Sequence, residues 1–161
     1  MGKDSLIFRS SVKSDIQSVY DIERNDENRS FIRQWTMEQH INAIVDNNYA
    51  HLIIETVEKR RTVGYIILVG LDNPDKSIEY KRLVISEKGK GFGRKAMQMM
   101  KKYVFEDLNA HRLWLEVIES NERAYKLYLS EGFVLEGKHR ESMIIGEQFC
   151  SLNVMSLLES E

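Results

Sequence analysis

The sequence contains one cysteine, one proline and no long apolar run, and each shortage excludes a class of protein. The lone Cys150 cannot form an internal disulfide, which fits a reducing compartment. Residues 1–9 contain no apolar stretch of signal-peptide length, and no later segment approaches the roughly 18 consecutive apolar residues of a membrane span. We therefore expect a cytoplasmic protein without a membrane partner.

Neither sign of charge is in large excess. Lysine and arginine number 23 against 25 acidic residues, so the formal net charge is -2 and gives no electrostatic reason to propose nucleic acid as a partner. The four histidines, His40, His51, His111 and His139, have neither metal-ligand spacing nor a nearby cysteine, so we expect no metal site. A chain of 161 residues with 42% hydrophobic residues suits one buried core, and we expect a single domain over residues 1–161.

The order of the periodic segments predicts an α+β fold with a mixed sheet. Two helices come first, Ile16 to Glu23 and one that begins at a capping box of Thr36 and Gln39, with a loop over residues 25–35 between them. Next come strands near residues 52–54, 63–69 and 78–85, a helix from Phe92, a strand over 112–118, a helix from Asn121 to Gly132, and strands near 134–145 and 149–157. Cys150 and the methionines 97, 99 and 100 are expected in the core.

The most informative segment is residues 85–96, where a strand runs through a glycine-rich turn into a helix. Such a junction gathers unpaired backbone N–H groups and the positive end of the helix dipole, and phosphate oxygens bind well there. Residues 81–102 carry eight basic residues against the single acid Glu87. The segment therefore predicts a phosphate site, although a tight turn with a solvated lysine face has the same composition.

Spacing separates the known kinds of phosphate loop. Gly93 is followed by Arg94 and Lys95 rather than by Lys-Ser/Thr, which excludes a Walker loop. Residues 91–96 satisfy the permissive Gly-x-Gly-x-x-Gly/Ala dinucleotide pattern, but about half the chain precedes them, whereas that pattern normally follows the first strand. The segment instead resembles the pyrophosphate loop of the GNAT acetyltransferases, Gln/Arg-x-x-Gly-x-Gly/Ala, with Lys88, Gly91 and Gly93 in its fixed positions.

A second stretch carries the same resemblance independently. A strand over residues 111–117, then Asn121-x-x-Ala124-x-x-x-Tyr128, then Gly132-Phe133, looks like the GNAT signature, and residues 134–140 are similar to the end of the spermidine and ribosomal-protein branches. The resemblance implies the GNAT fold: a mixed, mostly antiparallel twisted sheet of about six to seven strands, flanked by about four helices, with splayed central strands.

The resemblance also implies the chemistry, direct transfer of an acetyl group from acetyl-CoA to a primary amine in a ternary complex. Tyr128 would protonate the departing sulfur, Asn121 would position the pantetheine arm, and a backbone N–H of Val84 or Ile85 would face the thioester oxygen. The residues expected to bind the cofactor are Leu83, Val84, Ile85, Lys88, Gly89, Lys90, Gly91, Phe92, Gly93, Arg94, Asn121 and Ala124.

The acceptor side of the reaction needs a base and a pocket for the amine. Glu79, on the strand that enters the phosphate loop, is the expected catalytic base, with Glu116 or a water chain as alternatives. In the family, the loop between the first two helices roofs the acceptor pocket, so the substrate candidates are Glu23, Asp26, Arg29 and Trp35, with Glu27 and Phe31 beside them. A solvated loop would have the same composition. The acceptor is a small-molecule or peptide amine, and a homodimer is left open. The other readings are a CoA-binding module without turnover and a dinucleotide-binding enzyme.

Overall fold

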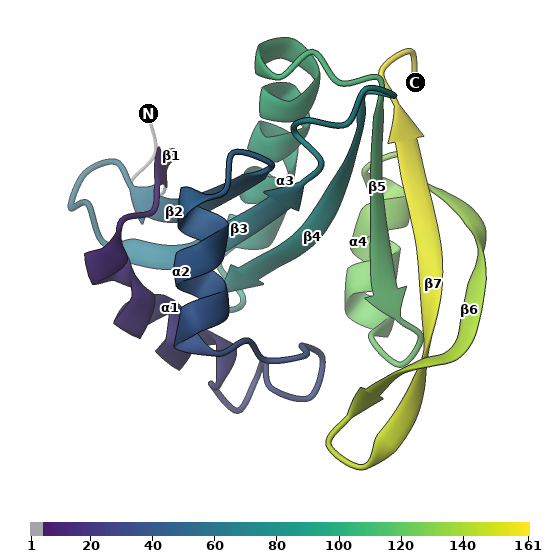
Figure 1. The fold of residues 1–161 in the computed structure, drawn as a ribbon, viewed down its shortest axis with the longest axis horizontal. Helices are drawn as coiled ribbons and strands as arrows, with labels where there is room; N and C mark the ends of the chain where they lie inside the picture. The colour runs from purple at the N-terminus through teal and green to yellow at the C-terminus, as the bar shows by residue number, and fades with distance from the viewer. Residues whose placement is uncertain (1–4) are drawn as a thin grey trace.

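The computed structural model describes residues 5–161 (Figure 1), and within this range one sheet of seven strands has the order β1-β2-β3-β4-β5-β7-β6. The strands are β1 (Leu6–Ser10), β2 (Tyr49–Thr56), β3 (Thr62–Val69), β4 (Ser77–Ile85), β5 (Arg112–Ile118), β6 (Val134–Ile145) and β7 (Gln148–Leu158). The helices are α1 (Ile16–Glu23), α2 (Met37–Val45), α3 (Phe92–Lys102) and α4 (Glu122–Ser130), with a 3₁₀ turn at Lys13–Asp15 and a π turn at Tyr103–Asp107. This is the predicted α+β architecture.

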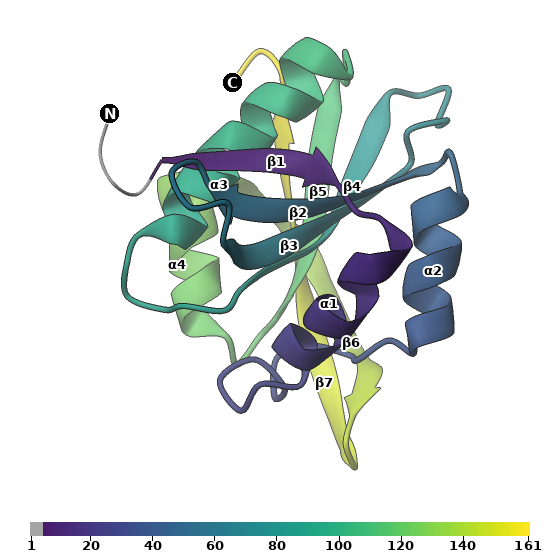
Figure 2. The same ribbon diagram turned by 90° about the vertical axis from the view of Figure 1, so that its left-hand side faces the viewer.

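Helices cover both faces of the sheet. Figures 1 and 2 show α1 and α2 against one face and α3 and α4 against the other. Because side chains alternate along a strand, each face has its own core. On β4, Ile85 packs in the core beneath α3 and α4, whereas Val84 joins Val19 and Ile53 beneath α1.

The pairing of β4 with β5 is the feature that creates room for a site. These two strands are parallel and pair only from Ser77 to Glu79, whereas the other neighbours in the sheet are antiparallel. Beyond Glu79 the strands diverge (Figure 1), as the expectation of splayed central strands requires. A bulge at Lys81 interrupts the register of β4 with β3 just where the divergence begins.

Local signals place the helix ends. Thr36 and Gln39 form the predicted capping box, with the Gln39 amide donating to the Thr36 hydroxyl at 3.1 Å and the Thr36 amide donating to the Gln39 side chain at 2.8 Å. Gly132 has a φ of 96° just after α4, which confirms it as the residue that ends that helix. No helix within residues 5–161 is long and apolar enough to cross a membrane.

Two expectations about the strands need correction. The sequence patterns missed β1, a short edge strand whose ladder to β2, Leu6 opposite Thr56, is a long-range pairing. The prediction of a buried Cys150 was wrong, because the outer part of the β6–β7 hairpin extends beyond the sheet (Figure 1), leaving Cys150 half-exposed and Phe149 66% exposed. Met97 and Met100 are fully buried as expected, and Met99 is half-buried.

Candidate active site

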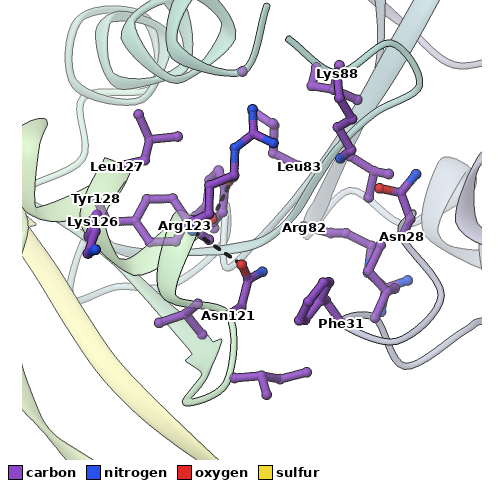
Figure 3. A pocket seen from close by; sticks show the side chains of 18 of the residues that line it. Asn28, Phe31, Arg82, Leu83, Lys88, Asn121, Arg123, Lys126, Leu127 and Tyr128 are labelled. Atoms are coloured by element: carbon purple, nitrogen blue, oxygen red, sulfur yellow. Dashed lines mark hydrogen bonds between the residues drawn. The ribbon is translucent and has the colours of Figure 1, made fainter. Parts of the chain in front are cut away.

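A cavity of ≈ 1030 Å³ lies where β4 and β5 diverge, and Figure 3 shows the side chains around it. Its walls come from β4, the glycine-rich loop, the start of α4, and the loop between α1 and α2. Most of the sequence-predicted cofactor residues line it; Lys90 is the exception. Those that do are Leu83, Val84, Ile85, Lys88, Gly89, Gly91, Phe92, Gly93, Arg94, Asn121 and Ala124.

The glycine-rich loop presents an open helix N-terminus at one end of this cavity. Gly91 is the N-cap of α3 with a φ of 75°, and Gly89 has a φ of 79°, values in the left-handed region that favours glycine. A Cβ built on Gly89, Gly91 or Gly93 would meet nothing within 4 Å. The amides of the first turn of α3 therefore face open space, which suits a diphosphate.

Much of the local positive charge is already paired. Lys90 donates to Glu87 at 2.9 Å, Arg61 also pairs with Glu87, and Arg94 donates to Glu131 at 2.7 Å. These carboxylates reduce the net charge that the sequence suggests for this end of the cavity.

Lys88 and Arg123 are two of the cations that line the cavity, together with Arg33, Lys81, Arg82, Arg94 and Lys126. Burial lowers the pKa of Lys88, with Glu27 acting in the opposite direction and the nearby Arg123 adding to the lowering. Both side chains appear around the cavity in Figure 3. Arg123 was missed from the sequence, where its place two residues after Asn121, in the first turn of α4, was the available signal.

The free edge of β4 supplies backbone donors. Ser86 donates its amide to the Val63 carbonyl at 2.8 Å, and in an antiparallel pair such bonds recur at every second residue. Val84, opposite Tyr65, therefore has its amide directed at β3, whereas the amide of Ile85 is directed at the gap that β5 leaves. Of the two donors that the sequence left open, the register favours Ile85.

Tyr128 is buried on α4 and lines the cavity, and its hydroxyl lies 3.3 Å from the hydroxyl of Tyr80 on β4. Burial raises the pKa of Tyr128, against a smaller lowering by the bond to Tyr80, so the phenol stays protonated at neutral pH. The ring packs 5.8 Å from Phe133. Asn121 caps α4 by accepting the Ala124 amide at 3.2 Å, which leaves its NH₂ group to offer a ligand.

A pair of carboxylates, Glu79 on β4 and Glu116 on β5, also lines the cavity. Burial raises the pKa of Glu79, Lys81 opposes the rise, and the charge of Glu116 adds to it. Glu116 also contacts His139 at 3.2 Å. The alternation along each strand places both carboxylates on the sheet face that α1 and α2 cover, opposite to Tyr128 and α4.

The four substrate candidates of the first loop lie outside the cavity lining. Glu23 is fully buried in the interior, Asp26 and Arg29 form an exposed ion pair at 3.4 Å, and Trp35 lines a separate small cavity beside α2. Glu27 and Phe31, named beside them in the sequence, do line the cavity, and the same loop adds Asn28, Ile32 and Arg33.

Tyr80 and Arg82 also line the cavity, and sequence reasoning did not mark them as site residues. Their positions on β4 depend on the bulge at Lys81, which no sequence pattern marks. Within residues 5–161, no group of three or more His, Cys, Asp or Glu side chains is arranged to hold a metal ion.

The cavity fits coenzyme A in two respects. Its glycine-rich end can hold a diphosphate, and the unpaired edge of β4 can hydrogen-bond an extended amide chain such as pantetheine. Both respects follow from backbone geometry.

Comparison with known proteins agrees with this interpretation of the cavity. A model of the acetyltransferase (GNAT) family matches residues 16–133. A spermidine N(1)-acetyltransferase of Vibrio cholerae is 26% identical, covering 97% of this chain and 94% of that protein. One of Escherichia coli (strain K12) is 28% identical, covering 90% of this chain and 81% of that protein.

A solved structure agrees with these relatives. The spermidine N-acetyltransferase of Vibrio cholerae in complex with CoA and spermine superposes with a TM-score of 0.86 at 25% identity, covering 96% of both chains.

Proposed function

Because this chain belongs to the acetyltransferase (GNAT) family and is an acetyl-CoA-dependent N-acetyltransferase, we propose that it acetylates a polyamine of the spermidine type. The observation that carries the choice of acceptor is the carboxylate pair Glu79 and Glu116 in the cavity wall. Two carboxylates held side by side attract a cationic chain, because a polyamine brings a positive charge near each of them. The matched relatives named for spermidine support the same class of acceptor.

The cavity separates the two halves of the reaction across the sheet. Figure 3 places Tyr128 on one side of the cavity and Phe31 with Arg82 on the other. The cofactor enters from the side of α3 and α4, where Gly91 and its neighbours hold the diphosphate. The amine enters from the side of α1 and α2, where Glu79 lies.

A primary amine of pKa about 10 is almost entirely protonated at pH 7, and removing its proton costs about 4 kcal/mol without a base. Glu79 accepts that proton, directly or through water, and its raised pKa makes it a stronger base than an exposed glutamate. Acetyl-CoA supplies the activated acetyl group. The Ile85 amide donates to the acyl oxygen as negative charge develops, and Tyr128 donates its proton to the departing sulfur.

The test is an amine panel with acetyl-CoA, in which thiol release and the acetylated product are both measured. The panel contains spermidine, spermine, an aminoglycoside and a peptide with a free N-terminus. We expect the highest kcat/KM for the polyamines, and a higher KM for spermidine in Glu116→Gln. Turnover of the peptide or the aminoglycoside without turnover of polyamines would refute the proposed polyamine acceptor. CoA binding without any amine-dependent thiol release would refute the assignment of enzymatic activity.

A further inference from the structure

A buried cluster of polar side chains lies beneath α1 and α2, next to the acceptor side of the cavity. Its centre is Glu23, a fully buried carboxylate that accepts hydrogen bonds from His40 at 2.9 Å, Tyr65 at 2.7 Å and the Trp35 amide at 3.3 Å. The guanidinium of Arg82 also donates to it. A carboxylate so removed from water needs all of these partners, and it has them.

The cluster continues through two histidines to β2. His40 contacts His51 at 3.0 Å, and His51 contacts the Ser11 hydroxyl at 2.7 Å. Burial lowers the pKa of His51 to about 4, with His40 adding to the lowering, so His51 is neutral at pH 7. If Ser11 donates to His51, His51 to His40 and His40 to Glu23, every ring nitrogen of the two histidines has a hydrogen-bond partner. Two arginines face Glu23, Arg82 and, at 3.6 Å, the more exposed Arg24, and Arg82 is the one that lines the cavity.

Arg82 connects the cluster to the cavity. Its guanidinium donates to the Arg33 carbonyl at 2.7 Å and lies 5.2 Å from the centre of the Trp35 ring, so it fastens the loop between α1 and α2 to β4. Arg82 and Arg33 both line the cavity. An unpaired guanidinium in this wall would repel a cationic amine, because a charge in a confined site is poorly screened.

We propose that Glu23 determines acceptor specificity by cancelling the charge of Arg82, so that the loop is held by a guanidinium while the wall still admits a polycation. Glu23 is thus a positioning and specificity residue that does not touch the substrate. The inference rests on the proposed polyamine function, since a neutral or anionic acceptor would gain nothing from the cancellation.

Glu23→Gln tests the charge while keeping the size of the side chain. We expect KM to rise with the charge of the acceptor, by on the order of tenfold for spermidine and only about twofold for a monoamine, because each added positive charge feels the uncompensated guanidinium. The KM for acetyl-CoA should stay within about twofold, since the diphosphate end of the cavity is remote from Glu23. Tyr65→Phe is the matched control, which removes one hydrogen bond from the same carboxylate without changing its charge, and it should not show the charge-dependent rise.

The double variant Glu23→Gln with Arg82→Gln removes both charges and should return the spermidine KM to within about threefold of wild type. Failure of this rescue in a folded, acetyl-CoA-binding double variant would overturn the inference, as would an equal KM rise for monoamine and spermidine. If Glu23→Gln does not fold, Arg82→Gln alone decides: a lower spermidine KM supports the inference and a higher one overturns it. If the wild type turns over no polyamine, the polyamine proposal fails on its own. The variants are then compared on the cationic amine that the wild type does acetylate.

Discussion

Replacing Tyr128 with phenylalanine removes one oxygen from the cavity wall and leaves the packing of α4 intact. The ring keeps its contact with Phe133 at 5.8 Å, and the lost hydrogen bond to Tyr80 is a long one of 3.3 Å. Because the buried Tyr80 hydroxyl loses this partner, the cost to the free energy of unfolding should be about 1–3 kcal/mol. A general acid contributes about 10²- to 10⁴-fold, so kcat should fall by that factor, equivalent to roughly 3–5 kcal/mol of barrier.

The assay is steady-state thiol release with saturating spermidine, combined with calorimetric binding of CoA. Binding should be unchanged within about twofold, because the diphosphate contacts lie at the start of α3. Tyr80→Phe is the matched control: it removes the same hydrogen bond from the other side, keeps the Tyr128 hydroxyl, and should lower kcat by less than about tenfold. If Tyr128→Phe retains half of the wild-type turnover, or if Tyr80→Phe is the slower variant, the assignment of Tyr128 as the acid is wrong.

Three further predictions concern charge and pH. Glu79→Gln should abolish the acidic limb of the pH profile of kcat/KM. Glu116→Gln should move that limb to lower pH, because removing the Glu116 charge lowers the raised pKa of Glu79. A limb that stays in place in both variants would exclude Glu79 as the base. Gly91→Glu and Gly91→Lys share the same backbone strain at a φ of 75°, so isothermal titration should show CoA affinity lost by about 100-fold or more only in the glutamate variant; equal losses would contradict a diphosphate site. The pKa of His51 is about 4 in the folded protein against 6.5 unfolded, so the unfolded state binds more protons between these values, and lowering the pH from 7 to 5 should reduce the free energy of unfolding by about 2 kcal/mol. Urea denaturation of wild type and His51→Gln checks this, and an equal pH dependence in both would contradict it.

The parts of the site that sequence could predict are those built from residues close together in the chain. The loop from Lys88 to Gly93 is one such part, since a strand, two left-handed glycines and a helix start are all local features. The spacing from Asn121 to Tyr128 is another, because it fixes the cap and the buried face of one helix. The helix positions followed from the periods of secondary structure, whereas the roles of Asn121 and Tyr128 came from the resemblance to the GNAT signature.

The parts that sequence missed depend on contacts between distant segments. From the sequence, Glu23 was a candidate for binding the cationic amine. Its partners Tyr65 and Arg82 lie 42 and 59 residues away in the chain, and its contacts with them bury it in the interior. His40 and His51 show no motif, yet the antiparallel sheet and α2 bring them to 3.0 Å. A local pattern cannot show which polar side chain will be buried, because burial is decided by the elements that fold over it.

The separation of β4 from β5 links the fold to the chemistry. Because pairing stops at Glu79, one edge of β4 is left with free backbone groups on the same strand that carries side chains to both faces of the sheet. Tyr80 meets Tyr128 on one face, Arg82 meets Glu23 on the other, and the bulge at Lys81 sets the phase between them. Deleting Lys81 would remove the bulge and turn the later side chains of β4 to the opposite face of the sheet. Arg82 would then lose Glu23 although neither residue had been changed, whereas Tyr80, which precedes the bulge, would keep its contact with Tyr128.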